Sequence, residues 1–101
     1  MNLLSKKVIN RKIKIGTINL KNPIIVGPMC QYSAKNGSPS KWHYNHLEKL
    51  CQSGASLVML ESTAVNKEGR ISKRDLVLEN KKQENSLKKL VKTLKKNNIK
   101  I

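Results

Sequence analysis

Residues 24–28 read Ile-Ile-Val-Gly-Pro, and this stretch decides the fold. Its three β-branched residues are continuous rather than alternating with polar ones, which is typical of a strand buried on both faces of a parallel sheet. Gly27-Pro28 ends the run, because proline lacks the N–H that a central strand needs. A second unalternating run, residues 57–60, predicts a second buried strand of the same kind.

A helix is predicted after each of these strands. Ser40 can begin the first helix, which runs to about residue 52, and Gly54 can end it in the left-handed conformation. Asn80 with Gln83 fits a capping box for a second helix that runs to about residue 97. Its apolar positions recur at helical spacing: Leu87, Leu90, Val91 and Leu94. Alternating strands and helices favour an α/β fold with a parallel sheet and right-handed crossovers.

Shorter elements are expected around these units. A hairpin over residues 12–20, with Gly16-Thr17 as its two-residue turn, precedes the first strand. Residues 64–79 are expected to form a long polar connection, and residues 99–101 predict the start of a third strand.

The composition excludes several classes of protein. No run approaches the roughly 18 apolar residues of a transmembrane helix, and residues 1–10 lack the hydrophobic region of a signal peptide. Cys30 and Cys51 are too few for a disulfide scaffold and lack the spacing of a metal site, so a reducing cytoplasm is the expected location. His43 and His46 have no third ligand near them and are expected to pack, not to bind a metal.

The net charge of +15 raises a nucleic-acid alternative, because lysine and arginine neutralise phosphates. Only Arg11, Arg70 and Arg74 are arginines, whereas base readout depends on arginine forks and single-strand binding on stacked aromatics. Aromatic residues make up only 3% of the chain. We therefore favour lysines on solvated surfaces and keep a small basic protein that binds RNA or another polyanion as the alternative.

Ligands in parallel α/β folds gather at the carboxyl ends of the strands. Residues 27–32 follow the first predicted strand, and residues 61–64 follow the second. Glu61 opens the second segment, where a lone carboxylate is expected to bond to loop amides.

Residues 26–33, Val-Gly-Pro-Met-Cys-Gln-Tyr-Ser, resemble the first-strand motif of the old yellow enzyme family, in its bacterial branch with a cysteine in this loop. The similarity continues in Trp42-His43, in residues 61–65 and in residues 68–72. The resemblance implies an FMN-binding (β/α)8 TIM barrel that takes hydride from NADPH or NADH. The acceptor would be the double bond of an α,β-unsaturated carbonyl compound, a small enone-type substrate.

The resemblance also implies roles for individual residues. The segment that lies against the flavin would be Gly27, Pro28, Met29 and Cys30, and the backbone of Ser62 would contact the ring edge. Cys30 would tune the flavin, because a weak thiol donor beside the ring alters its reduction potential. Tyr32 would contact the substrate.

A (β/α)8 barrel needs about 250 residues, so residues 1–101 are expected to form the truncated N-terminal part of an FMN-binding domain. We expect this segment alone to be inactive and to need the downstream barrel, or partners in a homo-oligomer, to complete its core. A folded remnant without catalytic role is a further alternative. Pro23 stands where the family commonly has arginine, which removes an ion pair.

Overall fold

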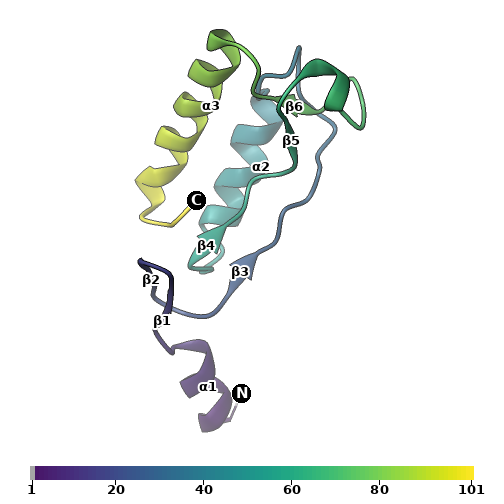
Figure 1. Cartoon of the computed structure of the whole chain (residues 1–101). Coiled ribbons are helices and arrows are strands. Elements are labelled where there is room, and N and C mark those ends of the chain that lie inside the picture. Colours follow the sequence, from purple (N-terminus) through teal and green to yellow (C-terminus); the bar gives the residue numbers. More distant parts are fainter. Residues whose placement is uncertain (1) are drawn as a thin grey trace.

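The computed structural model describes residues 2–101, in which two strand–helix units follow a hairpin and a short N-terminal helix (Figure 1). The helices are α1 (Leu3–Ile9), α2 (Lys41–Cys51) and α3 (Lys81–Leu94), with short 3-10 helices η1 (Lys67–Gly69) and η2 (Lys95–Asn97). The strands are β1 (Ile13–Ile15), β2 (Ile18–Leu20), β3 (Ile25–Val26), β4 (Leu57–Val58), β5 (Thr63–Ala64) and β6 (Leu76–Val77).

The parallel pair predicted from the two apolar runs is present as β3 and β4. Ile25 lies opposite Leu57 in this pair, and Val26 lies opposite Val58. Lys100 also bridges Leu57 in the parallel sense, and its carbonyl accepts a hydrogen bond from the Val58 N–H at 2.9 Å. Three successive segments separated by helices therefore lie side by side, as at the start of a (β/α)8 barrel.

Burial differs between the two strands. Val58 of β4 is fully buried, whereas Ile24 and Ile25 are 43% and 38% exposed. The reason is position in the sheet: β4 lies between β3 and Lys100, while β3 pairs with β4 alone among residues 2–101. The expectation of burial on both faces is confirmed for Val58 and is wrong for the Ile24-Ile25 run.

The hydrophobic core lies between the sheet and the two long helices. Its buried members come from α2, β4, α3 and the C-terminal segment: Leu47, Cys51, Val58, Leu90, Leu94 and Ile99. Leu90 and Leu94 have no exposed surface, which confirms the apolar helix face predicted from their spacing.

The capping box predicted at the start of α3 is also confirmed. The Asn80 side chain accepts from the Gln83 N–H at 2.9 Å, and the Gln83 side chain accepts from the Asn80 N–H at 3.2 Å. After α3 the chain continues through η2 to Asn98, whose φ of +55° turns the backbone out of the helix.

The N-terminal elements are simpler. The predicted hairpin is present as antiparallel β1 and β2, and Gly16 adopts the positive φ of +57° that its turn requires. α1 was not predicted, because residues 1–10 show only short apolar pairs. It begins where the Asn2 side chain accepts from the Ser5 N–H at 2.8 Å, and it buries none of its residues.

The long polar connection over residues 64–79 contains short regular elements that the sequence did not predict. β5 and β6 form a parallel pair within it, with Thr63 opposite Leu76 and Ala64 opposite Val77. Two-residue strands are too short to produce a hydrophobic period, so nothing local in the sequence announces them.

We expect Asn80→Ala to lower the free energy of unfolding by about 1 kcal/mol, the usual cost of losing a helix N-cap. Asn85→Ala is the matched control, because Asn85 is exposed inside the same helix and alanine has the higher helix propensity. Urea unfolding followed by circular dichroism measures both variants. Equal losses would contradict a specific capping role for Asn80.

Candidate functional site

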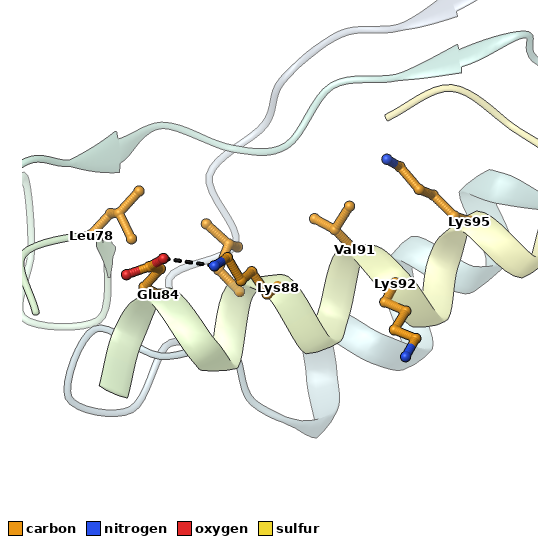
Figure 2. A pocket seen from close by; sticks show the side chains of 7 residues that line it. Leu78, Glu84, Lys88, Val91, Lys92 and Lys95 are labelled. Atoms are coloured by element: carbon orange, nitrogen blue, oxygen red, sulfur yellow. Dashed lines mark ion pairs between the residues drawn. The ribbon is translucent and has the colours of Figure 1, made fainter. Parts of the chain in front are cut away.

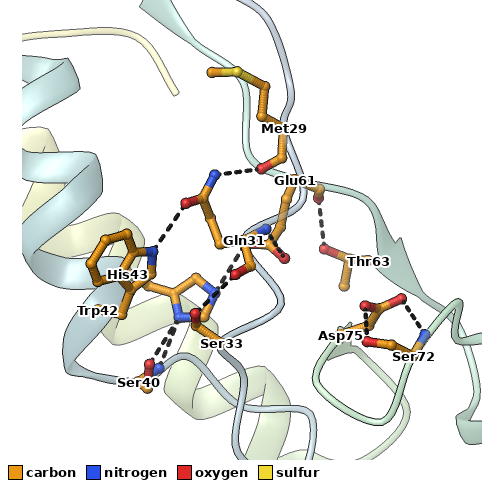
Figure 3. Close-up of polar contacts among 10 residues, drawn as sticks. All are labelled: Met29, Gln31, Ser33, Ser40, Trp42, His43, Glu61, Thr63, Ser72 and Asp75. Atoms are coloured by element: carbon orange, nitrogen blue, oxygen red, sulfur yellow. Dashed lines mark hydrogen bonds and ion pairs between the residues drawn. The ribbon is translucent and has the colours of Figure 1, made fainter.

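The carboxyl ends of β3 and β4 open onto one edge of the sheet. The Met59 N–H donates to the Val26 carbonyl at 3.0 Å, so the two chains leave the sheet side by side. We use the term rim for the two segments that continue from there, residues 27–32 and residues 61–62. Figure 3 shows Gln31 of the first segment next to Glu61 of the second.

The rim brings together the residues singled out in the sequence. Gly27, Pro28 and Ser62 are exposed, Met29 is 54% exposed, and Cys30 is half-buried. A Cβ placed on Gly27 would meet no atom within 4 Å, so the space beside its backbone is open. The rim is therefore accessible from solvent along both of its segments.

Free backbone donors lie on both segments of the rim. Within residues 2–101, the amides of Cys30 and Ser62 donate to no protein acceptor. Such donors suit a ligand whose edge carries carbonyl oxygens or ring nitrogens, because an amide needs an acceptor once a ligand excludes water.

Tyr32 ends the first segment in an unusual conformation. Its φ of +50° lies in the left-handed region, which a bulky residue rarely adopts. Its ring is 48% exposed, so the phenol is available to a ligand at the rim.

Gln31 makes hydrogen bonds to three other residues around the rim, although no role was expected for this residue within the segment 27–32. Its side-chain carbonyl accepts from the Trp42 indole N–H at 3.0 Å, and its amide donates to the Met29 carbonyl at 3.0 Å. Its backbone N–H donates to the Glu61 carboxylate at 3.4 Å. Gln31 thus joins both segments of the rim to α2 (Figure 3).

A buried pair lies behind the rim. His43 has no exposed surface, and its Nε2 lies 2.9 Å from Oε1 of Glu61, a residue that is 8% exposed. His43 also accepts from the Ser40 N–H through Nδ1 at 3.0 Å, which holds the start of α2. The expectation that Glu61 bonds to a loop amide is confirmed by its contact with Gln31.

The other histidine of α2 packs as expected. His46 stacks on Trp42 with 5.7 Å between the ring centroids and 10° between the ring planes. Within the described residues 2–101, no group of three or more His, Cys, Asp or Glu side chains is arranged to hold a metal ion.

Asp75 orders the loop between η1 and β6. Its carboxylate accepts from the Ile71 N–H at 2.7 Å, the Ser72 N–H at 3.2 Å and the Ser72 hydroxyl at 2.8 Å. Burial of the carboxylate raises its pKa, but these hydrogen bonds outweigh burial, so the pKa of Asp75 lies below its ordinary value. The backbone carbonyl of Arg74, the residue before Asp75, accepts from the Ala34 N–H at 2.9 Å. This bond connects the loop to the chain that follows Tyr32.

Larger concave surfaces than the one at the rim lie elsewhere. One groove of about 510 Å³ runs along α3 between an apolar stripe and several charged side chains (Figure 2): Leu78, Glu84, Leu87, Lys88, Val91, Lys92 and Lys95. Glu84 pairs there with Lys88 at 2.8 Å and with Lys81 at 3.2 Å, and these partners lower the pKa of Glu84. The groove is an uncovered helix face away from the strand ends, so we assign the candidate site to the rim.

Comparison with known proteins decides the family. A sequence model of the NADH:flavin oxidoreductase / NADH oxidase family matches residues 10–101. The chain belongs to this family. The resemblance to old yellow enzymes seen in the sequence is thereby confirmed.

Relatives from two bacterial genera support the assignment. An NADPH dehydrogenase of Listeria monocytogenes serotype 4b is 45% identical over 80 residues, which are 77% of this chain and 24% of that protein. An NADPH dehydrogenase of Bacillus cytotoxicus is 40% identical over 88 residues, which are 85% of this chain and 25% of that protein. The chain thus spans about a quarter of the length of these curated relatives.

Solved structures confirm the fold class. Morphinone reductase in complex with tetrahydroNAD matches with a TM-score of 0.80 and 16% identity, over 90% of this chain and 24% of that one. Old Yellow Enzyme from Pichia sp. AKU4542 matches with a TM-score of 0.79 and 18% identity, over 89% of this chain and 24% of that one. The family fold explains the opening strand–helix units. In the part that the structure describes, no helix is both long enough and apolar enough to cross a membrane.

We expect the free energy of unfolding to fall as the pH drops below about 3.8, the ordinary pKa of an aspartate. The folded-state pKa of Asp75 is lowered, so its contribution is present above the unfolded value and is lost as the pH falls through the folded value. Asp75→Asn should cost about 1–3 kcal/mol at neutral pH, since one of the two acceptor oxygens becomes an NH2 group that cannot accept from the loop donors.

The exposed Glu68 of the same loop supplies the control variant Glu68→Gln. Chemical unfolding between pH 3 and 7 compares the three proteins. An unchanged acid profile in Asp75→Asn, matching that of Glu68→Gln, would rule out Asp75 as the group responsible.

Proposed function

We propose that residues 1–101 form the N-terminal part of an FMN-binding barrel domain in an NAD(P)H-dependent oxidoreductase. The complete protein would take hydride from NADPH or NADH and reduce the double bond of an α,β-unsaturated carbonyl compound. The family membership and the names of the relatives support the class of reaction. The observation that carries the assignment of the site is the pair of free amides on one exposed rim, at Cys30 and Ser62.

The rim fits one edge of a flavin. An isoalloxazine ring is planar and has carbonyl oxygens and ring nitrogens along its edges, which are acceptors for the amides of Cys30 and Ser62. The open space beside Gly27 allows a flat ring to approach the backbone, which a side chain at this position would hinder. When bound, FMN supplies the hydride chemistry, and the protein supplies orientation and electrostatics.

Each proposed residue then has a defined task. Gly27, Pro28 and Met29 support the ring, and the exposed Met29 side chain shields it from water. Cys30 presents a weak thiol donor to the ring. Tyr32, with its exposed phenol, donates a hydrogen bond to the carbonyl oxygen of the substrate and so orients the double bond.

The contacts of Trp42, the only tryptophan of the chain, argue against the polyanion alternative. Single-strand binding needs aromatic rings on which bases can stack. The ring of Trp42 already stacks on His46, and its N–H donates to Gln31 at 3.0 Å. One face and the polar edge of this ring are therefore used within the protein.

The decisive experiment joins residues 1–101 to the remaining barrel of the Listeria relative. We expect the purified chimera to bind FMN, with a visible flavin spectrum that NADPH bleaches, and to oxidise NADPH when an enone is added. A folded chimera without bound flavin would refute the proposal. Steeply salt-dependent RNA binding by the same protein, without flavin binding, would favour the polyanion alternative.

In this chimera we expect Cys30→Ala to shift the flavin reduction potential by about 30 mV. For a two-electron couple this shift corresponds to about 1.4 kcal/mol, the scale of one hydrogen bond. Cys51→Ala is the matched control, because Cys51 is the last residue of α2 and is buried in the core. Identical potentials in the two variants, measured by dye-coupled titration, would remove Cys30 from the site.

A further inference from the structure

The buried carboxylate of Glu61 makes contacts through both of its oxygens (Figure 3). Oε1 lies 2.9 Å from His43 Nε2, and Oε2 accepts from the Gln31 backbone N–H at 3.4 Å. The Glu61 side chain is only 4% exposed. Burying a carboxylate is costly unless hydrogen bonds compensate it, so this arrangement needs a reason.

The hydrogen bonds around His43 fix the proton positions. The Ser40 N–H donates to Nδ1 at 3.0 Å, so Nδ1 carries a lone pair and Nε2 carries the hydrogen. Nε2 therefore donates to Glu61, whose two oxygens both act as acceptors. No Lys or Arg within residues 2–101 pairs with this carboxylate.

The position of Glu61 in the chain lets its side chain hold two loops together. Glu61 directly precedes Ser62, and Gln31 directly follows Cys30. One carboxylate thus links both segments of the rim to α2. The Gln31 side chain strengthens the link through its 3.0 Å bonds to Trp42 and to the Met29 carbonyl.

We propose that Glu61 and Gln31 are positioning residues of the rim, which hold the amides of Cys30 and Ser62 in place before a ligand arrives. The inference rests on the proposed function, in which those amides meet the flavin. Neither residue needs to touch the flavin for this role. Pre-organisation lowers the entropy cost of binding, because the loop after Gly27 is already ordered.

Glu61→Gln tests the proposal in the 101-residue chain without flavin. His43 Nε2 and the Gln31 N–H are both donors, and a glutamine offers only one acceptor oxygen, so one of the two bonds is lost. We expect hydrogen exchange at the Gln31 amide and alkylation of Cys30 by iodoacetamide to become roughly tenfold faster, as for a lost bond to a charged group. Peptide mass spectrometry separates Cys30 from Cys51.

A second variant and a control make the outcome decisive. Gln31→Ala leaves the buried pair intact and removes only the bonds to Trp42 and Met29, and it should also accelerate alkylation of Cys30. Glu79→Gln is the matched control, because the exposed Glu79 carboxylate accepts a loop amide, the Lys67 N–H at 3.2 Å, away from the rim. This control should leave Cys30 and Gln31 unchanged.

Two results would overturn the proposal. The first result is that Cys30 alkylation and Gln31 amide exchange are as slow in Glu61→Gln and Gln31→Ala as in the control Glu79→Gln. The other is a uniform acceleration of all amides in Glu61→Gln with no change at Cys30 in Gln31→Ala, which would make Glu61 a general stability residue. Local acceleration at the rim, together with a chimera that binds no FMN, would support the positioning role and refute the flavin function separately.

Discussion

The hydrogen bond between His43 and Glu61 joins α2 to the segments that follow β3 and β4. On one side the imidazole also binds the Ser40 N–H and so sets where α2 begins. On the other side, Glu61 lies in the segment that follows β4, and its carboxylate also accepts from the Gln31 N–H in the loop that follows β3. Loss of either partner would leave a buried polar group unpaired, which usually costs far more than the pair itself contributes.

The parts of the fold that the sequence predicts are those whose signals are local. The Asn80–Gln83 box and the apolar spacing of Leu90 and Leu94 lie within one helix, and both are present as expected. The apolar runs at β3 and β4 predict their own pairing, because two strands separated by one helix favour a parallel neighbour.

The parts that escape prediction depend on partners far along the chain. β5 and β6 have two residues each and pair with each other across the η1 loop. Two residues are too few to show the alternation of apolar and polar side chains that predicts a strand. The position of the rim after two predicted strands is visible in the sequence, whereas the individual roles of residues 27–30 and 62 come only from their resemblance to a family motif. The contacts of Glu61 cannot be read from the sequence, because this residue lies 18 positions from His43 and 30 positions from Gln31.

The open edge of β3 has a consequence for the behaviour of the chain in solution. Within residues 2–101, β3 pairs on one side only and carries half-exposed isoleucines, and such an edge is a template for pairing with another copy. Every copy also carries a net charge of +15, so two edges meet only against strong mutual repulsion. At 0.1 M salt the Debye length is about 10 Å, so repulsion between charges farther apart than this is largely screened. The strand edge itself does not change with salt. The lysine excess thus opposes pairing between copies at the β3 edge, and this opposition weakens as the ionic strength rises.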